Sequence, residues 1–180
     1  MERLYKLFLT IVSLLLSFVV FLAKEKIIIY PLYPCLPSFP TMYYYAAYLF
    51  GIIILTGISI YCARFLSSDE INKDSITVVE PANDDFLPSY LGYFFVALSV
   101  PSMKIFLFVF GIISLFIYFS KISYFNPVFF LFGYRFYYIV TKNNIKVLLI
   151  TRKLLKNASN LEFKNLRRIN NYTFIDMNRG

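Results

Sequence analysis

The chain has 180 residues, of which 59% are hydrophobic, 21% aromatic and 16% charged, whereas a soluble domain carries roughly 25% charged residues. This composition predicts a membrane protein. The sequence contains no histidine and only two cysteines, which excludes most histidine-based acid–base, metal and triad chemistry. The formal charge is +8, and most of it lies in the C-terminal third.

Two long apolar segments open the chain. Residues 7–23 are uncharged and would reach about 25 Å as a helix, which predicts a first membrane span. A signal peptide is the alternative, but Lys-Glu-Lys follows this segment instead of a cleavage site. Residues 43–63 predict a second span, with tyrosines clustered at its start as in an interfacial aromatic belt.

Two shorter apolar segments follow. Residues 86–103 predict a third span that Pro88 and Pro101 shorten, with a re-entrant hairpin as the alternative. Residues 105–120 predict a fourth span. The apolar segment 124–134 contains a proline near its start and is interpreted as an interfacial segment.

The tail after residue 121 has the pattern of short strands. Residues 136–140 and 146–151 are rich in β-formers and flank a Lys-Asn-Asn turn, which predicts a hairpin. Residues 161–163 and 172–174 suggest further strands. The predicted fold class is therefore an all-α polytopic membrane protein with about four short transmembrane helices and a small C-terminal cytoplasmic β-rich module. Its domains are residues 1–121 and 122–180.

Charge predicts the orientation in the membrane. The tail from Lys121 onward has 11 Lys and Arg and two acidic residues, a charge of +9, whereas residues 66–85 carry −5. Since Lys and Arg mark the cytoplasmic side, the tail is expected in the cytoplasm. Four crossings place the N-terminus and the acidic connection on the same side.

The predicted spans contain no chemistry for catalysis or transport. No charged residue lies inside them, which argues against a pump, and their hydroxyl and thiol groups lack a basic partner. We expect no enzyme activity, cofactor or metal site. Ser13 with Ser17, and Ala47 with Gly51, place small residues on one helix face, where we expect helices to pack closely and the chain to oligomerise.

Prolines occupy every third position after the first span. Polyproline II turns once in three residues, so these prolines would form one stripe of a stiff arm on the envelope side. One interpretation is a rigid apolar feeler or oligomer contact in the envelope, and the interpretation that we favour is a stiff connector. The four residues are Pro31, Pro34, Pro37 and Pro40.

The two opposed charge blocks predict a docking surface for a soluble partner. Attraction to anionic lipid headgroups is the alternative explanation of the basic residues. The candidate docking residues are Asp69, Glu70, Asp84, Asp85, Arg152, Lys153, Lys156, Arg167 and Arg168.

Two short motifs carry a family resemblance. The sequence NPVFFLFGY begins at Asn126, and VLLITRK ends at Lys153. With the order of apolar segments, they make the chain resemble the membrane subunit of the Kiwa anti-phage system, the KwaA-like proteins of bacteria. The resemblance implies a non-enzymatic sensor or scaffold in the inner membrane, a homo-oligomer that works with a cytoplasmic DNA-binding effector subunit (KwaB-like). Nucleic acid would be contacted only through that partner. The alternatives are a small immunity or superinfection-exclusion protein and, if the assembly conducts ions, a holin-like pore.

Overall fold

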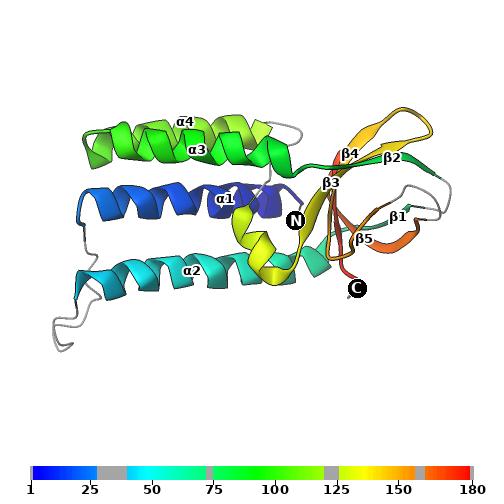
Figure 1. Ribbon diagram of the computed structural model, residues 1–180, viewed down its shortest axis with the longest axis horizontal. Coiled ribbons are helices and arrows are strands. Elements are labelled where there is room, and N and C mark those ends of the chain that lie inside the picture. Colours follow the sequence, from blue (N-terminus) through cyan, green and yellow to red (C-terminus); the bar gives the residue numbers. More distant parts are fainter. Residues whose placement is uncertain (1, 28–39, 72–74, 120–125, 157–160, 179–180) are drawn as a thin grey trace.

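The computed structural model describes residues 2–27, 40–71, 75–119, 126–156 and 161–178, except the side chains of residues 2 and 83–86. The molecule is elongated, with helices at one end and a β-sheet at the other (Figure 1). The chain runs away from the sheet and back to it twice through the helices. The start of the first helix therefore lies near the sheet.

The helices occupy the four apolar segments of the sequence. The first helix lies between the other three, and a short 3₁₀ helix continues the second. Arg3–Lys24 and Thr41–Phe65 are long and apolar enough to cross a membrane, whereas the last two helices have 17 residues each. The helices are α1 (Glu2–Lys24), α2 (Thr41–Cys62), η1 (Ala63–Phe65), α3 (Asn83–Ser99) and α4 (Met103–Phe119).

The described strands form one six-stranded sheet. Its order is β1-β5-β6-β4-β3-β2, and every pair is antiparallel except β4 with β6. The predicted hairpin is confirmed, and Asn144 in its turn has a positive φ of 57°. The strands are β1 (Ser68–Ile71), β2 (Ile76–Pro81), β3 (Arg135–Thr141), β4 (Lys146–Thr151), β5 (Phe163–Asn170) and β6 (Thr173–Asp176).

The predicted all-α class is wrong, because the chain is a mixed α/β protein. The sequence predicts no strand in the acidic connection between α2 and α3, but this connection supplies β1 and β2 at the two edges of the sheet. Both are short and find their hydrogen-bond partners only in the tail, about 60 to 100 residues away along the chain. The prediction of four transmembrane helices is also corrected, since α1 and α2 are the described helices that reach spanning length.

The sheet must curl strongly. Six strands side by side extend about 24 Å, because neighbouring strands lie about 4.8 Å apart. Five residue steps separate Ile71 from Ile76, and they cover at most about 18 Å. The two edges therefore approach each other, and Ile71 and Ile76 pack in the same apolar cluster.

Both faces of the sheet are apolar. On β3, Tyr137 and Ile139 belong to the cluster that the strands enclose, whereas Phe136 and Tyr138 belong to the cluster shared with the helices. Successive side chains of a strand point to opposite faces, so a strand that is buried on both sides has an almost continuous apolar sequence. This explains the uninterrupted apolar run VLLI in β4.

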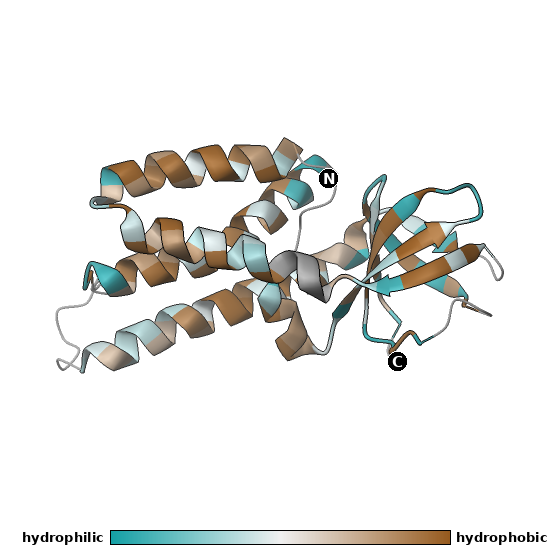
Figure 2. Ribbon diagram, turned by 45° about the horizontal axis from the view of Figure 1, so that its top comes forward, coloured by the Kyte–Doolittle hydropathy of each residue, from teal (hydrophilic) through white to brown (hydrophobic). Residues whose placement is uncertain are grey.

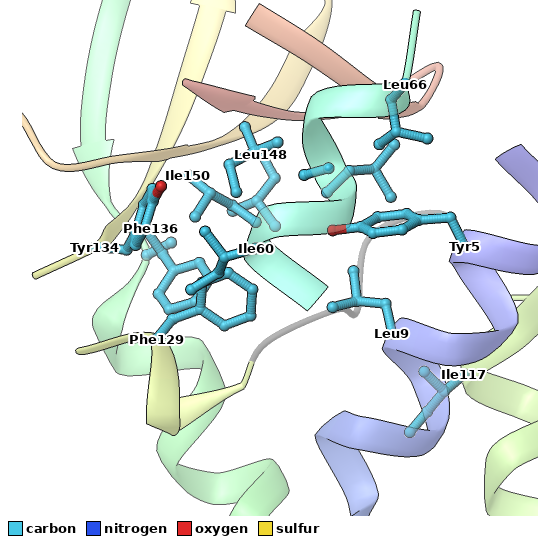
Figure 3. Close-up of a cluster of buried hydrophobic side chains, with 14 of the residues drawn as sticks. Tyr5, Leu9, Ile60, Leu66, Ile117, Phe129, Tyr134, Phe136, Leu148 and Ile150 are labelled. Atoms are coloured by element: carbon cyan, nitrogen blue, oxygen red, sulfur yellow. The ribbon is translucent and has the colours of Figure 1, made fainter. Parts of the chain in front are cut away.

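A single buried cluster joins the helices to the sheet (Figure 3). Tyr5 of α1 and Ile60 of α2 meet Phe136 of β3 and Ile150 of β4 in it. Phe129 fills the centre, is fully buried and contacts the Phe136 ring edge-on with centroids 6.0 Å apart. The sheet is thus packed on the helices.

Phe129 belongs to the 3₁₀ helix η2 (Pro127–Phe132), which comes from the NPVFFLFGY motif. The Asn126 side chain caps this helix by accepting a hydrogen bond from the Val128 amide at 2.9 Å, and it donates one to the Thr56 hydroxyl at 3.2 Å. Gly133 ends it with φ of 78°, where glycine avoids the steric cost of a Cβ. The motif therefore forms a capped turn that anchors the sheet to α2.

Candidate functional site

The helices consist mostly of hydrophobic residues (Figure 2), and many of their large apolar side chains are exposed. Phe50 on α2 is 63% exposed, Phe95 on α3 65% and Phe108 on α4 69%. In the described strands, Val78 is the one large apolar side chain that is exposed. Soluble monomers rarely expose contiguous apolar patches of more than a few hundred Å². This surface is therefore suited to an apolar surrounding such as a lipid bilayer.

The two ends of the molecule differ in the number of basic residues that they carry. At the helix ends that point away from the sheet, the described cations are Lys24, Lys26 and Lys104. The other described Lys and Arg residues lie at the sheet end. Lys24 bonds the Val100 carbonyl at 2.6 Å and so ties α1 to the end of α3.

The envelope-side arm lies almost wholly outside the described residues, which include Pro40 but not Pro31, Pro34 or Pro37. Pro40 precedes α2 with φ of −51° and ψ of 140°, close to polyproline II geometry.

The small residues singled out in the sequence lie in two different environments. Ser13 and Ser17 are buried in α1, and each hydroxyl donates to a carbonyl of the same helix at 2.7 Å. The Ser13 carbonyl also accepts a hydrogen bond from the Tyr90 hydroxyl of α3 at 2.8 Å. In contrast, Ala47 is exposed and a Cβ at Gly51 would meet nothing within 4 Å, so this face of α2 is open within the chain.

The structure brings part of the acidic and basic blocks together. Strand β1 contains Asp69 and Glu70 and pairs antiparallel with β5. Ser68 of β1 lies opposite Arg167 of β5. In the described part of the chain no ion pair joins the two strands; Arg167 donates to the Leu66 carbonyl at 3.1 Å instead. Asp84 and Asp85 lie in the first turn of α3, and their side chains are outside the description.

The basic residues after β4 do not form one patch. The Arg152 guanidinium lies over the Tyr134 ring, 4.6 Å from its centroid, beside the helices. The Lys153 ammonium lies 5.2 Å from the Phe163 ring centroid, in the cluster that the strands enclose. Lys156 is exposed. Successive residues thus point to different sides of the sheet.

A polar cleft of about 210 Å³ lies where α2 meets the sheet. Its lining includes Tyr61 of α2, Arg64 of η1, and Tyr134 and Arg152 next to the sheet. The Arg64 guanidinium lies 5.3 Å from the Tyr61 ring centroid. Sequence reasoning missed Arg64 and Tyr134, although Arg64 is the first charge after the longest uncharged run, a position typical of the membrane boundary.

The surroundings of Tyr134 shift the pKa of its hydroxyl upward. Burial raises the pKa of this phenol above its ordinary value; Arg152 and Arg64 lower the pKa, and Asp176 raises it. Both carboxylate oxygens of Asp176 are already bonded, one by the Thr151 hydroxyl at 2.9 Å and the other by the Asn178 amide at 3.0 Å. Within the described residues, no group of three or more potential ligands could hold a metal ion.

The fold and these surfaces define an α/β protein in which apolar helices carry a curled, charged sheet at one end. The family model of the anti-phage protein KwaA matches residues 5–175. The chain belongs to this family, which confirms the resemblance seen in the sequence and assigns it to anti-phage defence. Searches of curated proteins and of solved structures gave no match.

Proposed function

We propose that this chain is a non-enzymatic sensor and scaffold in the bacterial inner membrane that docks a cytoplasmic DNA-binding effector subunit. Helices α1 and α2 cross the bilayer, and the α3–α4 hairpin packs against α1 beside them. The hairpin begins and ends at the sheet, so both chain ends and the sheet lie on the cytoplasmic side.

One observation carries the membrane placement. Large apolar side chains are exposed on every described helix, whereas charged residues gather at the sheet end. A bilayer is apolar over about 30 Å, and α1 with 23 residues reaches about 35 Å as a helix. The basic tail supports the cytoplasmic assignment of the sheet.

The docking role rests on charge at the sheet end. Strand β1 is an edge strand that presents Asp69 and Glu70 next to the basic β5. Complementary charge steers the encounter of partners, and an acidic edge beside a basic strand gives the partner an orientation. The open face of α2 around Ala47 and Gly51 supports assembly of several copies, because small residues let helices approach closely.

Cysteine labelling tests the placement. In a cysteine-free background, Lys26→Cys should react with a membrane-impermeant thiol reagent in intact cells, whereas Lys142→Cys in the β3–β4 turn should react only after lysis. The two variants are matched, because both replace an exposed lysine. The reverse pattern would refute the orientation, and equal labelling in a soluble fraction would refute the membrane placement.

Co-purification tests docking. Asp69→Lys with Glu70→Lys should reduce capture of the product of a neighbouring gene from detergent extracts, more strongly as salt falls. The control is Lys142→Glu, a charge reversal in the hairpin turn. Capture at the unmodified level by the acidic-strand variant, with the oligomer intact, would refute docking through β1.

A further inference from the structure

The polar cleft lined by Arg64 and Arg152, called the arginine cleft from here on, contains no residue of the proposed docking strand β1. It lies at the end of α2, where the uncharged helix surface stops and the charged sheet begins. Arg152 was among the candidate docking residues, but its guanidinium lies in this cleft rather than beside Lys153. The cleft is therefore a candidate binding site separate from β1.

The two guanidinium groups differ in exposure, since Arg64 is exposed and Arg152 is half-buried. In the described part of the chain, neither Arg64 nor Arg152 forms an ion pair, and the buried Nε of Arg152 has no hydrogen-bond partner. A buried donor left unpaired costs free energy, so the pair of charges favours an anion that accepts several hydrogen bonds. Aromatic rings hold both side chains, because Arg152 lies on Tyr134 and Arg64 on Tyr61.

We propose that this cleft binds the phosphate of an anionic phospholipid of the cytoplasmic leaflet. Guanidinium groups bind phosphate oxygens with paired, charge-assisted hydrogen bonds, and the protonated Tyr134 hydroxyl adds a donor. The two arginines and Asp176 carry a net charge of +1, which matches a phosphodiester with one negative charge. A zwitterionic headgroup brings an additional ammonium, which the two arginines repel.

The surroundings favour a lipid over a soluble phosphate. Below the cleft, Phe50, Ile54 and Ile58 on α2 are exposed and recur every four residues, so they line one face of the helix. Tyr61 continues this face up to the cleft, with its side chain 57% exposed. A headgroup in the cleft would thus place its acyl chains against an apolar ridge. Bound lipid would fix the depth of the sheet at the membrane surface.

The inference rests on the proposed membrane placement, and its test is made on the purified full-length protein in detergent. The protein is titrated with phosphatidylglycerol, phosphatidylcholine and inorganic phosphate, while bound lipid is counted by native mass spectrometry. Phosphatidylglycerol should bind at least about tenfold more tightly than phosphatidylcholine, as expected when charge-assisted bonds to two arginines are gained. Inorganic phosphate should not compete at the same concentration.

Variants locate the binding. Arg64→Gln with Arg152→Gln should abolish the preference, whereas Lys142→Gln with Lys164→Gln, which removes the same charge from exposed positions, should keep it. Tyr134→Phe retains the ring beneath Arg152 and should weaken binding about twofold to fivefold. If the arginine double variant does not fold, the Tyr134→Phe variant still tests the inference.

Three results would overturn the inference. The first is an equal loss of the phosphatidylglycerol preference in both double variants. The second is an unchanged preference in Tyr134→Phe and in a folded arginine double variant, and the third is displacement of the lipid by inorganic phosphate. The last would assign the cleft to a soluble phosphate. Failure of the membrane placement is separate, because the labelling experiment detects it in cells whatever the lipid preference in detergent.

Discussion

Asn126 holds the sheet to the helices, and replacing it should destabilise the protein measurably. Asn126→Ala removes the cap of η2 and leaves the Val128 amide unpaired. It also removes the donor to the Thr56 hydroxyl, in a site where Asn126 is 1% exposed and Thr56 fully buried. Loss of a cap costs about 0.5–2 kcal/mol, and an unpaired buried group about 1–3 kcal/mol.

We expect the free energy of unfolding to fall by about 1–3 kcal/mol. For a chain of this size, about 1 kcal/mol lowers the melting temperature by 2–4 °C, so the shift should be about 2–12 °C. The assay is thermal unfolding of the purified protein in detergent. Asn143→Ala is the matched control, because this asparagine is exposed in the β3–β4 turn and its removal should change stability by less than about 0.5 kcal/mol.

A double-mutant cycle isolates the contact with α2. Thr56→Val keeps the shape of the side chain but removes the acceptor. Combined with Asn126→Ala, it should give a coupling free energy of about 0.5–1.5 kcal/mol. A coupling near zero, or a melting temperature of Asn126→Ala equal to that of the control, would refute the view that this side chain ties η2 to α2.

Further predictions concern the backbone, the helix contacts and pH. Gly133→Ala should lower the free energy of unfolding by about 1–2 kcal/mol in the same assay, because the backbone there has a positive φ. Gly111→Ala, at an open position of α4, should raise the free energy of unfolding by up to about 1 kcal/mol. Tyr90→Phe should lower it by about 0.6 kcal/mol through loss of the bond to α1, and Tyr93→Phe should leave it unchanged within error. Because the pKa of folded Tyr134 lies above the ordinary 10.0, the unfolded chain loses this proton first as pH rises, so stability should be constant below about pH 10 and fall above it. Tyr134→Phe should reduce that fall, as measured by melting between pH 8 and 11, and identical profiles would contradict it.

The sequence alone determined the helical end and the central hairpin. The four apolar runs of 16 residues or more predicted helices, because a helix pairs its polar backbone groups within the same segment. The Lys-Asn-Asn turn between two β-rich runs specified β3 and β4, because both the turn and the strand pattern are local. The family resemblance likewise rested on local motifs, among them the Asn126 cap and the Gly133 end of η2.

Tertiary structure alone decided the edges of the sheet and the arginine cleft. Strands β1 and β2 are four and six residues long and become strands only when distant tail segments offer hydrogen bonds, so their sequences read as an acidic loop. Arg64 and Arg152 are 88 positions apart, and the curl of the sheet onto α2 is what brings them to one cleft. Local patterns report propensity and periodicity, whereas the pairing of distant segments depends on which surfaces remain to be buried once those elements have formed.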